Sequence, residues 1–399
     1  MANNGYIRSL DGLRAVAILL VMSYHGELDR FGWTGVQLFF VLSGFLITGI
    51  LWNERSRPGS NSFKFKKFWV RRALRIFPLY FGFIGVIGII YLLSHFPVYY
   101  PSYFPYLITY TANYVPLFPG WYGNPLFTHL WSLSIEEQFY LLFPFIILLG
   151  RKGFIRALLL SIIALGPVAR FLLGQYFRNK GYDDTLVAHM VDMHTLSHLD
   201  AFCYGGVIPV FSLDTRLKHP TTILGAATVL LVGIGLLNYL NTPTPYNFWQ
   251  DGGFNHWYIN NYQHVWIYSL FNLFSASLIL FLVSRHSAGR LSLLRKFFES
   301  SWMVGIGKIS YGMYVFHWLI LVYVIPRIFN MESYSMKLIT FIPFVAAVYG
   351  FSLISYKFYE SRFIRMKDRL FKYPDTDKKR FPSSDAAIVR EESAGRING

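Results

Sequence analysis

Long apolar stretches separated by short polar connections make up most of this 399-residue chain. A helix needs about 20 mostly apolar residues to cross the hydrocarbon core of a bilayer. Ten stretches approach this length, although 199–213 is short. The pattern predicts an all-α polytopic membrane bundle with spans near 9–27, 32–52, 74–93, 133–149, 155–173, 199–213, 221–239, 264–284, 304–325 and 336–357.

The segment 103–118 is also apolar, but it is short and interrupted by proline. The charges of the loops decide its placement, because Lys and Arg concentrate in cytoplasmic loops. The connections 53–75, 150–156, 214–219 and 285–296 are all basic. They share one side only if ten spans cross and 103–118 stays at the outer interface. This topology also predicts that both termini are cytoplasmic.

Composition agrees with a membrane protein, since 54% of the residues are hydrophobic and only 15% are charged. A soluble protein of this length carries about 25% charged residues. The 37 Lys and Arg outnumber the 21 Asp and Glu, and cytoplasmic loops explain this excess. Nucleic-acid binding is the other interpretation, but no basic module stands apart from the apolar stretches. The predicted environment is therefore membrane lipid, with no nucleic-acid partner.

The polar, aperiodic end of the chain predicts a disordered cytoplasmic tail at 371–399, after one transmembrane domain at 1–370. The first apolar run lacks a small-residue cleavage site, so we expect a retained span and not a signal peptide. The single cysteine, Cys203, excludes an internal disulfide framework.

Two ionisable residues, Arg14 and His25, flank the first apolar stretch. They are eleven residues apart, so a helix would place them on the same face and about 16 Å apart along its axis. Ionisable side chains in a span are costly and indicate a functional site. The alternative is that Arg14 reaches the cytoplasmic headgroups and His25 ends the helix on the outer side.

Arg72 and Arg75 lie at positions i and i+3 near the start of the third predicted span, so they share a helical face. Paired guanidinium groups suit phosphate, because each presents a planar fork of donors. Anchoring at the cytoplasmic surface is the alternative, and it explains a pair on one face less well than a single arginine.

The stretch HLWSLSIEEQ at 129–138 enters the fourth predicted span from outside. Ser134 and Glu137 fit a capping box, in which a serine and the glutamate three residues later cap the helix start. Glu136 is then left without a structural role. A carboxylate in that position is suited to orient a histidine.

Other residues at the predicted outer ends of spans are candidates for binding an acceptor. The set is Trp131, Ser132, Glu137, His198 and Asp200. The alternatives are interfacial anchoring for the aromatic residue and a solvated loop for the polar ones. Neither metal-ligand spacing nor a glycine-rich phosphate loop occurs, so no metal cofactor is expected.

Taken together, these stretches resemble the acyltransferase 3 family of membrane-bound O-acyltransferases. The resemblance extends to about residue 370 and rests on motifs in order: SLDGLRAVAILLVMSYH, FFVLSGFLITGIL, RRALRIFPLY, HLWSLSIEEQFYLLFP, SHLDAFCYGG, GKISYGMYVFHWLI and YESRFIR. His198 stands where the family often has arginine, and the usual proline of the last motif is missing. His317 matches a family position without an assigned role.

The resemblance implies transfer of an acyl group, usually acetyl, to a hydroxyl of a glycan or glycolipid at the bacterial cytoplasmic (inner) membrane. Some members modify macrolides or other small molecules, and some carry a fused extracytoplasmic SGNH domain. This chain is too short to hold such a domain. It is expected to complete the transfer itself or with a separate extracytoplasmic partner.

On this interpretation Arg14, Arg72 and Arg75 bind the phosphates of acetyl-CoA from the cytoplasm. His25 acts as general base toward the acceptor hydroxyl, and Glu136 steadies its ring. Acylation of His25 itself before transfer remains the alternative chemistry. A ten-span secondary transporter without acyltransferase activity is the alternative class, but the two halves of the sequence show no similarity.

Overall fold

The structure is a computed structural model that describes residues 6–117, 126–242, 247–254, 260–284, 292–329 and 333–370. Throughout these ranges the regular elements are helices, and none is a strand, which confirms the all-α class. The predicted tail at 371–399 lies outside the described residues.

Each of the ten predicted spans coincides with a helix or a broken helix. These are α1 (Arg8–His25), α2 (Thr34–Arg55), α3 (Asn61–Ser94), α5 (Trp131–Leu149), α6 (Lys152–Asn179), α8 (Leu199–Phe211), α10 (Pro220–Asn241), α12 (Gln263–Val283), α14 (Ser301–Lys308) with α15 (Ser310–Tyr323), and α16 (Tyr334–Ser355). Shorter helices connect them: α4 (Tyr100–Ile108), α7 (Asp184–Met193), α9 (Leu213–Arg216), α11 (Phe248–Asp251), α13 (Ser292–Glu299) and α17 (Ser361–Leu370).

Seven helices in the described ranges are long and apolar enough to cross a membrane, so the chain is a multi-pass membrane protein. The pair α14 and α15 makes an eighth if it counts as one span, with a bend of 72° between its halves. Helix α1 is not among the seven, because three of its 18 residues are charged. Helix α8 is not among them either, because it has only 13 residues. The count of ten and the cytoplasmic termini remain predictions.

Residues 103–117 of the segment 103–118 form most of α4 and the 3₁₀ helix η1 (Ala112–Leu117), which have nine and six residues, and residue 118 lies outside the described ranges. At 1.5 Å per residue, α4 is about 14 Å long and cannot cross a core of about 30 Å. This length agrees with the expected interfacial position.

The third predicted span, 74–93, begins much earlier than expected. Helix α3 starts at Asn61, where the Ser60 side chain accepts a hydrogen bond from the Phe63 amide. The first turns of α3 carry lysines and arginines beside aromatic residues, of which Phe68 is buried, and a search for purely apolar stretches passes over such a segment. Arg72 and Arg75 therefore lie inside a long helix and not at its start.

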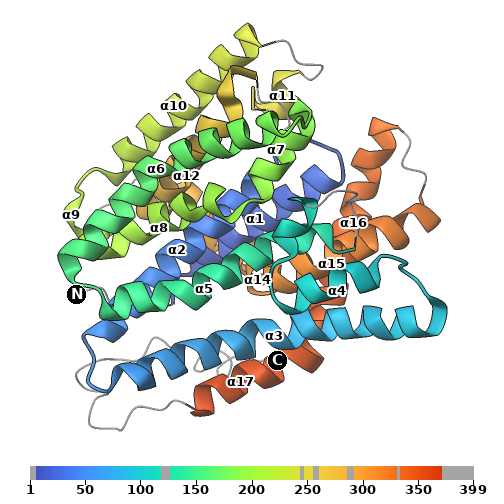
Figure 1. Cartoon of the computed structure of the whole chain (residues 1–399), viewed down its shortest axis with the longest axis horizontal. Helices are drawn as coiled ribbons and strands as arrows, with labels where there is room; N and C mark the ends of the chain where they lie inside the picture. Colours follow the sequence, from blue (N-terminus) through green and yellow to red (C-terminus); the bar gives the residue numbers. More distant parts are fainter. Residues whose placement is uncertain are drawn as a thin grey trace.

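Close helix packing forms the centre of the bundle, where glycines let backbones approach. A Cβ on Gly44 of α2 would lie 2.0 Å from the carbonyl oxygen of Phe202 in α8, and one on Gly205 of α8 would lie 1.9 Å from that of Val41 in α2. Small residues at such contacts are typical of membrane helices. Figure 1 shows α10 along one outer edge of the bundle and α3 with α17 along another.

Candidate active site

A cavity of about 100 Å³ lies between α1, α2, α3, α5 and α15, and we name it the basic cavity. It brings together four predicted site residues that are far apart in the sequence. Arg14 comes from α1, Arg72 and Arg75 come from α3, and Glu136 comes from α5. Ser132, predicted to bind the acceptor, also lines this cavity.

Positive charge dominates the basic cavity. Arg14 pairs with Asp11 one turn earlier on α1. Within the described ranges neither Arg72 nor Arg75 forms an ion pair, although the Arg72 guanidinium stacks 5.6 Å above the Tyr140 ring. This arrangement leaves two guanidinium groups available to an anion, which agrees with the predicted phosphate site.

Glu136 does not orient His25, contrary to the prediction from sequence. Its Oε1 accepts hydrogen bonds from the hydroxyls of Ser43 and Tyr140, and all three residues line the basic cavity. His25 lines a different cavity. The sequence could not show that Glu136 and His25 line different cavities, because the register of α5 against α1 depends on packing.

The predicted capping box is also wrong. Helix α5 begins at Trp131, three residues before Ser134, and Leu130 occupies its N-cap without a side-chain hydrogen bond. The Ser134 hydroxyl donates to the Leu130 carbonyl at 3.2 Å. Glu137 lines neither cavity, and its Oε1 has no hydrogen-bond partner within the described part of the chain.

The second cavity has a volume of about 370 Å³, and we name it the histidine cavity. His25 lines it together with the predicted Trp131 and with four other aromatic residues, Tyr24, Trp33, Tyr314 and Trp318. Polar side chains complete the wall, among them Gln37, His129, His189 and Asp192.

The imidazole of His25 contacts a second histidine. His25 Nδ1 lies 2.8 Å from His317 Nε2, and the two rings stack with centroids 5.0 Å apart. His317 is fully buried on α15, and its Nδ1 lies 2.6 Å from the Tyr314 carbonyl oxygen. The sequence singled out His317 without assigning it a role, and the structure shows that it contacts His25.

The two cavities adjoin at Val36 and Tyr314, which line both of them. The Tyr314 hydroxyl donates to the His129 carbonyl at 2.8 Å and lies 2.5 Å from the Ser132 hydroxyl. A side-chain pair from α15 and α5 therefore stands where the cavities meet. Arg14, in the first half of α1, and His25, its last residue, line one cavity each, which agrees with their predicted common face.

His198, predicted to bind substrate, lies behind the wall of the histidine cavity. It is fully buried, and its Nε2 donates to the Asp192 carbonyl. Its Nδ1 therefore accepts from Gln37 Nε2, at 2.9 Å. Gln37 and Asp192 line the cavity and His198 does not, so His198 fixes two wall residues.

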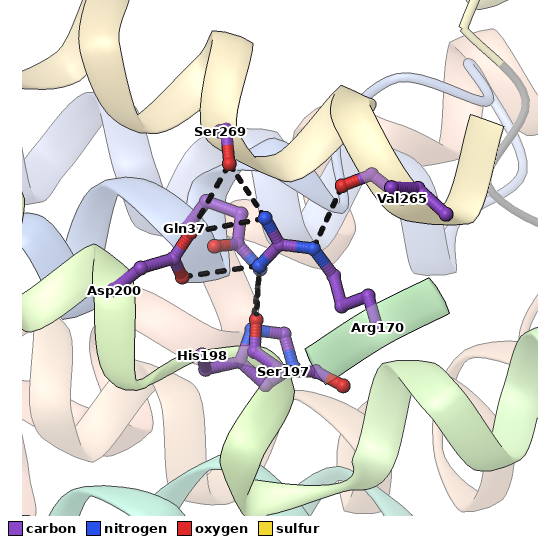
Figure 2. Close-up of polar contacts among 7 residues, drawn as sticks. All are labelled: Gln37, Arg170, Ser197, His198, Asp200, Val265 and Ser269. Atoms are coloured by element: carbon purple, nitrogen blue, oxygen red, sulfur yellow. Dashed lines mark hydrogen bonds and ion pairs between the residues drawn. The ribbon is translucent and has the colours of Figure 1, made fainter. Parts of the chain in front are cut away.

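Asp200 lies deeper, in an ion pair that the sequence analysis missed. Figure 2 shows Arg170 of α6 beside Asp200 of α8, and the two terminal nitrogens of Arg170, Nη1 and Nη2, donate to Oδ1 and Oδ2 of the carboxylate at 3.1 and 3.0 Å. The same guanidinium donates to the carbonyls of Ser197 and Val265 and to the hydroxyl of Ser269. Neither member of the pair is exposed.

The family pattern often has an arginine at position 198, two residues before Asp200, where this chain has His198. In this structure the arginine beside Asp200 is Arg170, which comes from another helix. A sequence signal for Arg170 existed, because it is the single charged residue of the predicted span 155–173 other than Arg156 at its start. An ionisable residue inside a span is a candidate for a functional or structural site.

Asp192 is a second residue that the sequence did not flag, because 174–198 read as a loop and the structure forms α7 there. Burial raises the pKa of Asp192 to about 7, and a hydrogen bond from the Tyr268 hydroxyl at 2.8 Å opposes this rise. Burial also lowers the pKa of the neighbouring His189 to about 4. The wall of the histidine cavity thus holds a neutral imidazole and a carboxyl that titrates near neutral pH.

Comparison with known proteins gives a consistent family. The profile described as Acyltransferase domain (Acyl_transf_3) matches residues 7–357. O-acetyltransferase OatA of Staphylococcus aureus strain NCTC 8325 / PS 47 is 30% identical over 344 residues, covering 80% of this chain and 51% of OatA. A protein of strain COL that is provisionally named an O-acetyltransferase is 29% identical over 379 residues, covering 90% and 57%.

The chain therefore spans about half the length of the curated relatives it matches. No solved structure matches it. The match over residues 7–357 includes both cavities and every residue of the candidate site. The chain belongs to the acyltransferase 3 family.

Proposed function

We propose that the protein is an O-acetyltransferase of the bacterial cytoplasmic membrane. It transfers an acetyl group from cytoplasmic acetyl-CoA to a hydroxyl of an extracytoplasmic or lipid-linked glycan. The observation that carries the proposal is the pair of adjoining cavities, one lined by Arg14, Arg72 and Arg75 and the other by His25.

The basic cavity supports the donor assignment. Acetyl-CoA carries phosphates at one end and its thioester at the end of a narrow arm. Arginines bind phosphate through charge-assisted hydrogen bonds. A volume of about 100 Å³ suits the arm and not the nucleotide. The adenosine would therefore stay at the cytoplasmic mouth, with the phosphates at the arginines, while the arm carries the thioester toward the junction at Tyr314.

The histidine cavity supports the acceptor assignment. Its volume of about 370 Å³ falls within the range for small-ligand sites, about 300 to 1,000 Å³. Its five tryptophan and tyrosine side chains offer flat surfaces to the apolar faces of a sugar. Gln37 and Asp192 offer hydrogen-bonding groups to its hydroxyls.

The reaction follows from this placement. The neutral imidazole of His25 accepts the proton of the acceptor hydroxyl as its oxygen attacks the thioester carbonyl. The carbon–sulfur bond then breaks, and the coenzyme thiolate takes up the proton from His25. The products are the acetyl ester and the free thiol of CoA, so atoms and charge balance.

The direct test uses purified protein in nanodiscs with isotopically labelled acetyl-CoA and glycan fractions from the cell envelope. We expect label in the glycan, and an acetyl mass shift that is absent with His25→Ala. Glycan transfer that requires an added extracytoplasmic protein would identify a partner. Transfer by His25→Ala at the wild-type rate, or no acetyl transfer to any fraction with or without that protein, would refute the proposal.

A further inference from the structure

We infer that His317 holds His25 in one tautomer, so that Nε2 of His25 is the nitrogen that accepts the substrate proton. The inference rests on the proposed function, because it assigns a positioning residue to the same reaction. It starts from a backbone carbonyl, which fixes the direction of each hydrogen bond that follows.

A carbonyl oxygen can only accept a hydrogen bond. His317 Nδ1 lies 2.6 Å from the Tyr314 carbonyl oxygen, so the proton of this bond belongs to Nδ1. The His317 side chain is 0% exposed, and within the described residues none of its contacts is to a carboxylate. An unpaired charge would be costly at such a site, so His317 is neutral. Its Nε2 therefore carries a lone pair.

This lone pair faces His25. His317 Nε2 lies 2.8 Å from His25 Nδ1, and only His25 can supply the proton of that bond. The neutral imidazole of His25 is then protonated at Nδ1, and its basic nitrogen is Nε2. The other titratable rings beside His317, those of His129 and Tyr314, contact it through their faces or edges and leave this chain of bonds intact.

The arrangement prepares His25 for proton transfer. When Nε2 takes the substrate proton, Nδ1 still donates to His317, so the ring need not turn or exchange a proton at that moment. The imidazolium also keeps a hydrogen-bond acceptor beside it, which a buried charge requires. His317 lines neither cavity, so it acts through His25 and not on the substrate.

A matched pair of substitutions tests the role of His317. Gln places its side-chain oxygen near the position of Nε2 and can accept from His25, whereas Leu cannot accept a hydrogen bond. We expect His317→Leu to lower kcat by about 10²-fold, the low end for loss of general-base catalysis, with KM for acetyl-CoA unchanged. We expect His317→Gln to recover at least half of this loss on a logarithmic scale.

The control is His264→Leu, which removes another buried histidine, on α12, that lines neither cavity. It should transfer acetyl groups at nearly the wild-type rate. A purely structural role for His317 would lower acetyl-CoA binding and thermal stability, and Gln would not restore kcat. That pattern, or full activity of His317→Leu, would overturn the inference.

A spectroscopic readout is independent of activity. In protein labelled with ¹⁵N-histidine, the His25 signals are assigned by their loss in His25→Ala. We expect the proton on Nδ1 in the wild type and a shift of population toward Nε2–H in His317→Leu. A wild-type proton on Nε2 would overturn the inference even if the enzyme is active, whereas an inactive wild type with the proton on Nδ1 would refute only the proposed reaction.

Discussion

At the scale of single residues, the ion pairs of this protein lie in very different surroundings. Arg170 and Asp200 are fully buried and share their bonds with two carbonyls and a serine hydroxyl. Arg178 and Asp184 form a pair at 3.3 Å that is 31% and 60% exposed. Burial decides how much each pair contributes, because removing one partner leaves the other charge in an apolar medium.

We therefore expect Asp200→Asn to lower the free energy of unfolding by about 3 to 5 kcal/mol. Arg178→Ala, the matched exposed pair, should change it by less than about 1 kcal/mol. Thermal unfolding of the purified protein in detergent, read by tryptophan fluorescence, compares the two. Equal effects would mean that the buried pair is not a structural element of the bundle.

The arginines of the basic cavity allow a binding prediction. Arg72→Ala and Arg75→Ala should each weaken acetyl-CoA binding by about 1.5 to 3 kcal/mol, the cost of a hydrogen bond to a charged group. Lysine should rescue only in part, because it lacks the planar fork. Arg71→Ala is the control, since Arg71 lies on the same helix but does not line the cavity. Calorimetric titration with a non-hydrolysable analogue measures the loss, and an unchanged affinity in the folded double variant would contradict the donor site.

Asp192 gives a pH prediction. Its pKa is raised from an ordinary value of 3.8 to about 7 in the folded state, so between these values the folded protein holds a proton that the unfolded chain has released. Stability from this group is therefore present at low pH and is lost as the pH rises toward about 7. Asp192→Asn should show a smaller fall of the melting temperature between pH 4.5 and 7.5. Asp184→Asn, on the exposed side of α7, should keep the wild-type dependence.

At the scale of elements, the apolar pattern predicted where helices lie better than where they begin. All ten predicted stretches coincide with helices, because a long apolar run has few alternatives in a bilayer. The start of α3 was missed, since basic residues are interspersed with aromatic ones there. The break at Ile309 between α14 and α15 was missed as well, because no proline marks it and the nearby Gly307 is a weak signal in membrane helices, where glycine is frequent.

Close packing between elements depends on the glycine at the contact of α2 and α8. We expect Gly44→Ala to lower stability by about 1 to 3 kcal/mol, because its new methyl group would meet the Phe202 backbone. Gly225→Ala on α10 should be neutral or slightly stabilising, since no atom lies within 4 Å of the added Cβ. Melting temperatures of the two variants, measured side by side, test the contact. A harmless Gly44→Ala would show that the helices can move apart.

At the scale of the whole molecule, the sequence predicted the members of the site better than their grouping. Arg14, Arg72, Arg75 and Glu136 do meet in one cavity, and His25 and Trp131 meet in another. Which residues contact each other depends on helix register and rotation, which periodicity does not give. For this reason Glu136 was assigned to His25, although the structure places His317 there.

The topology is tested by labelling introduced cysteines with an impermeant thiol reagent in intact cells. Cysteines at 108 in α4 and at 185 in α7 should react from outside, and a cysteine at 60 should not. The native Cys203 is buried and should stay unlabelled. A labelled residue 60 or a protected residue 185 would contradict the orientation derived from the basic loops.

The contact between Tyr314 and Ser132 has a consequence for the cell as well as for the reaction. An enzyme with a recess toward each side of an energised membrane risks becoming a leak for protons and small ions. The Tyr314 side chain lines both cavities, and its hydroxyl lies 2.5 Å from the Ser132 hydroxyl. In the proposed transfer, this contact would keep the two cavities separate, so that acetyl groups could pass outward without loss of the electrochemical gradient.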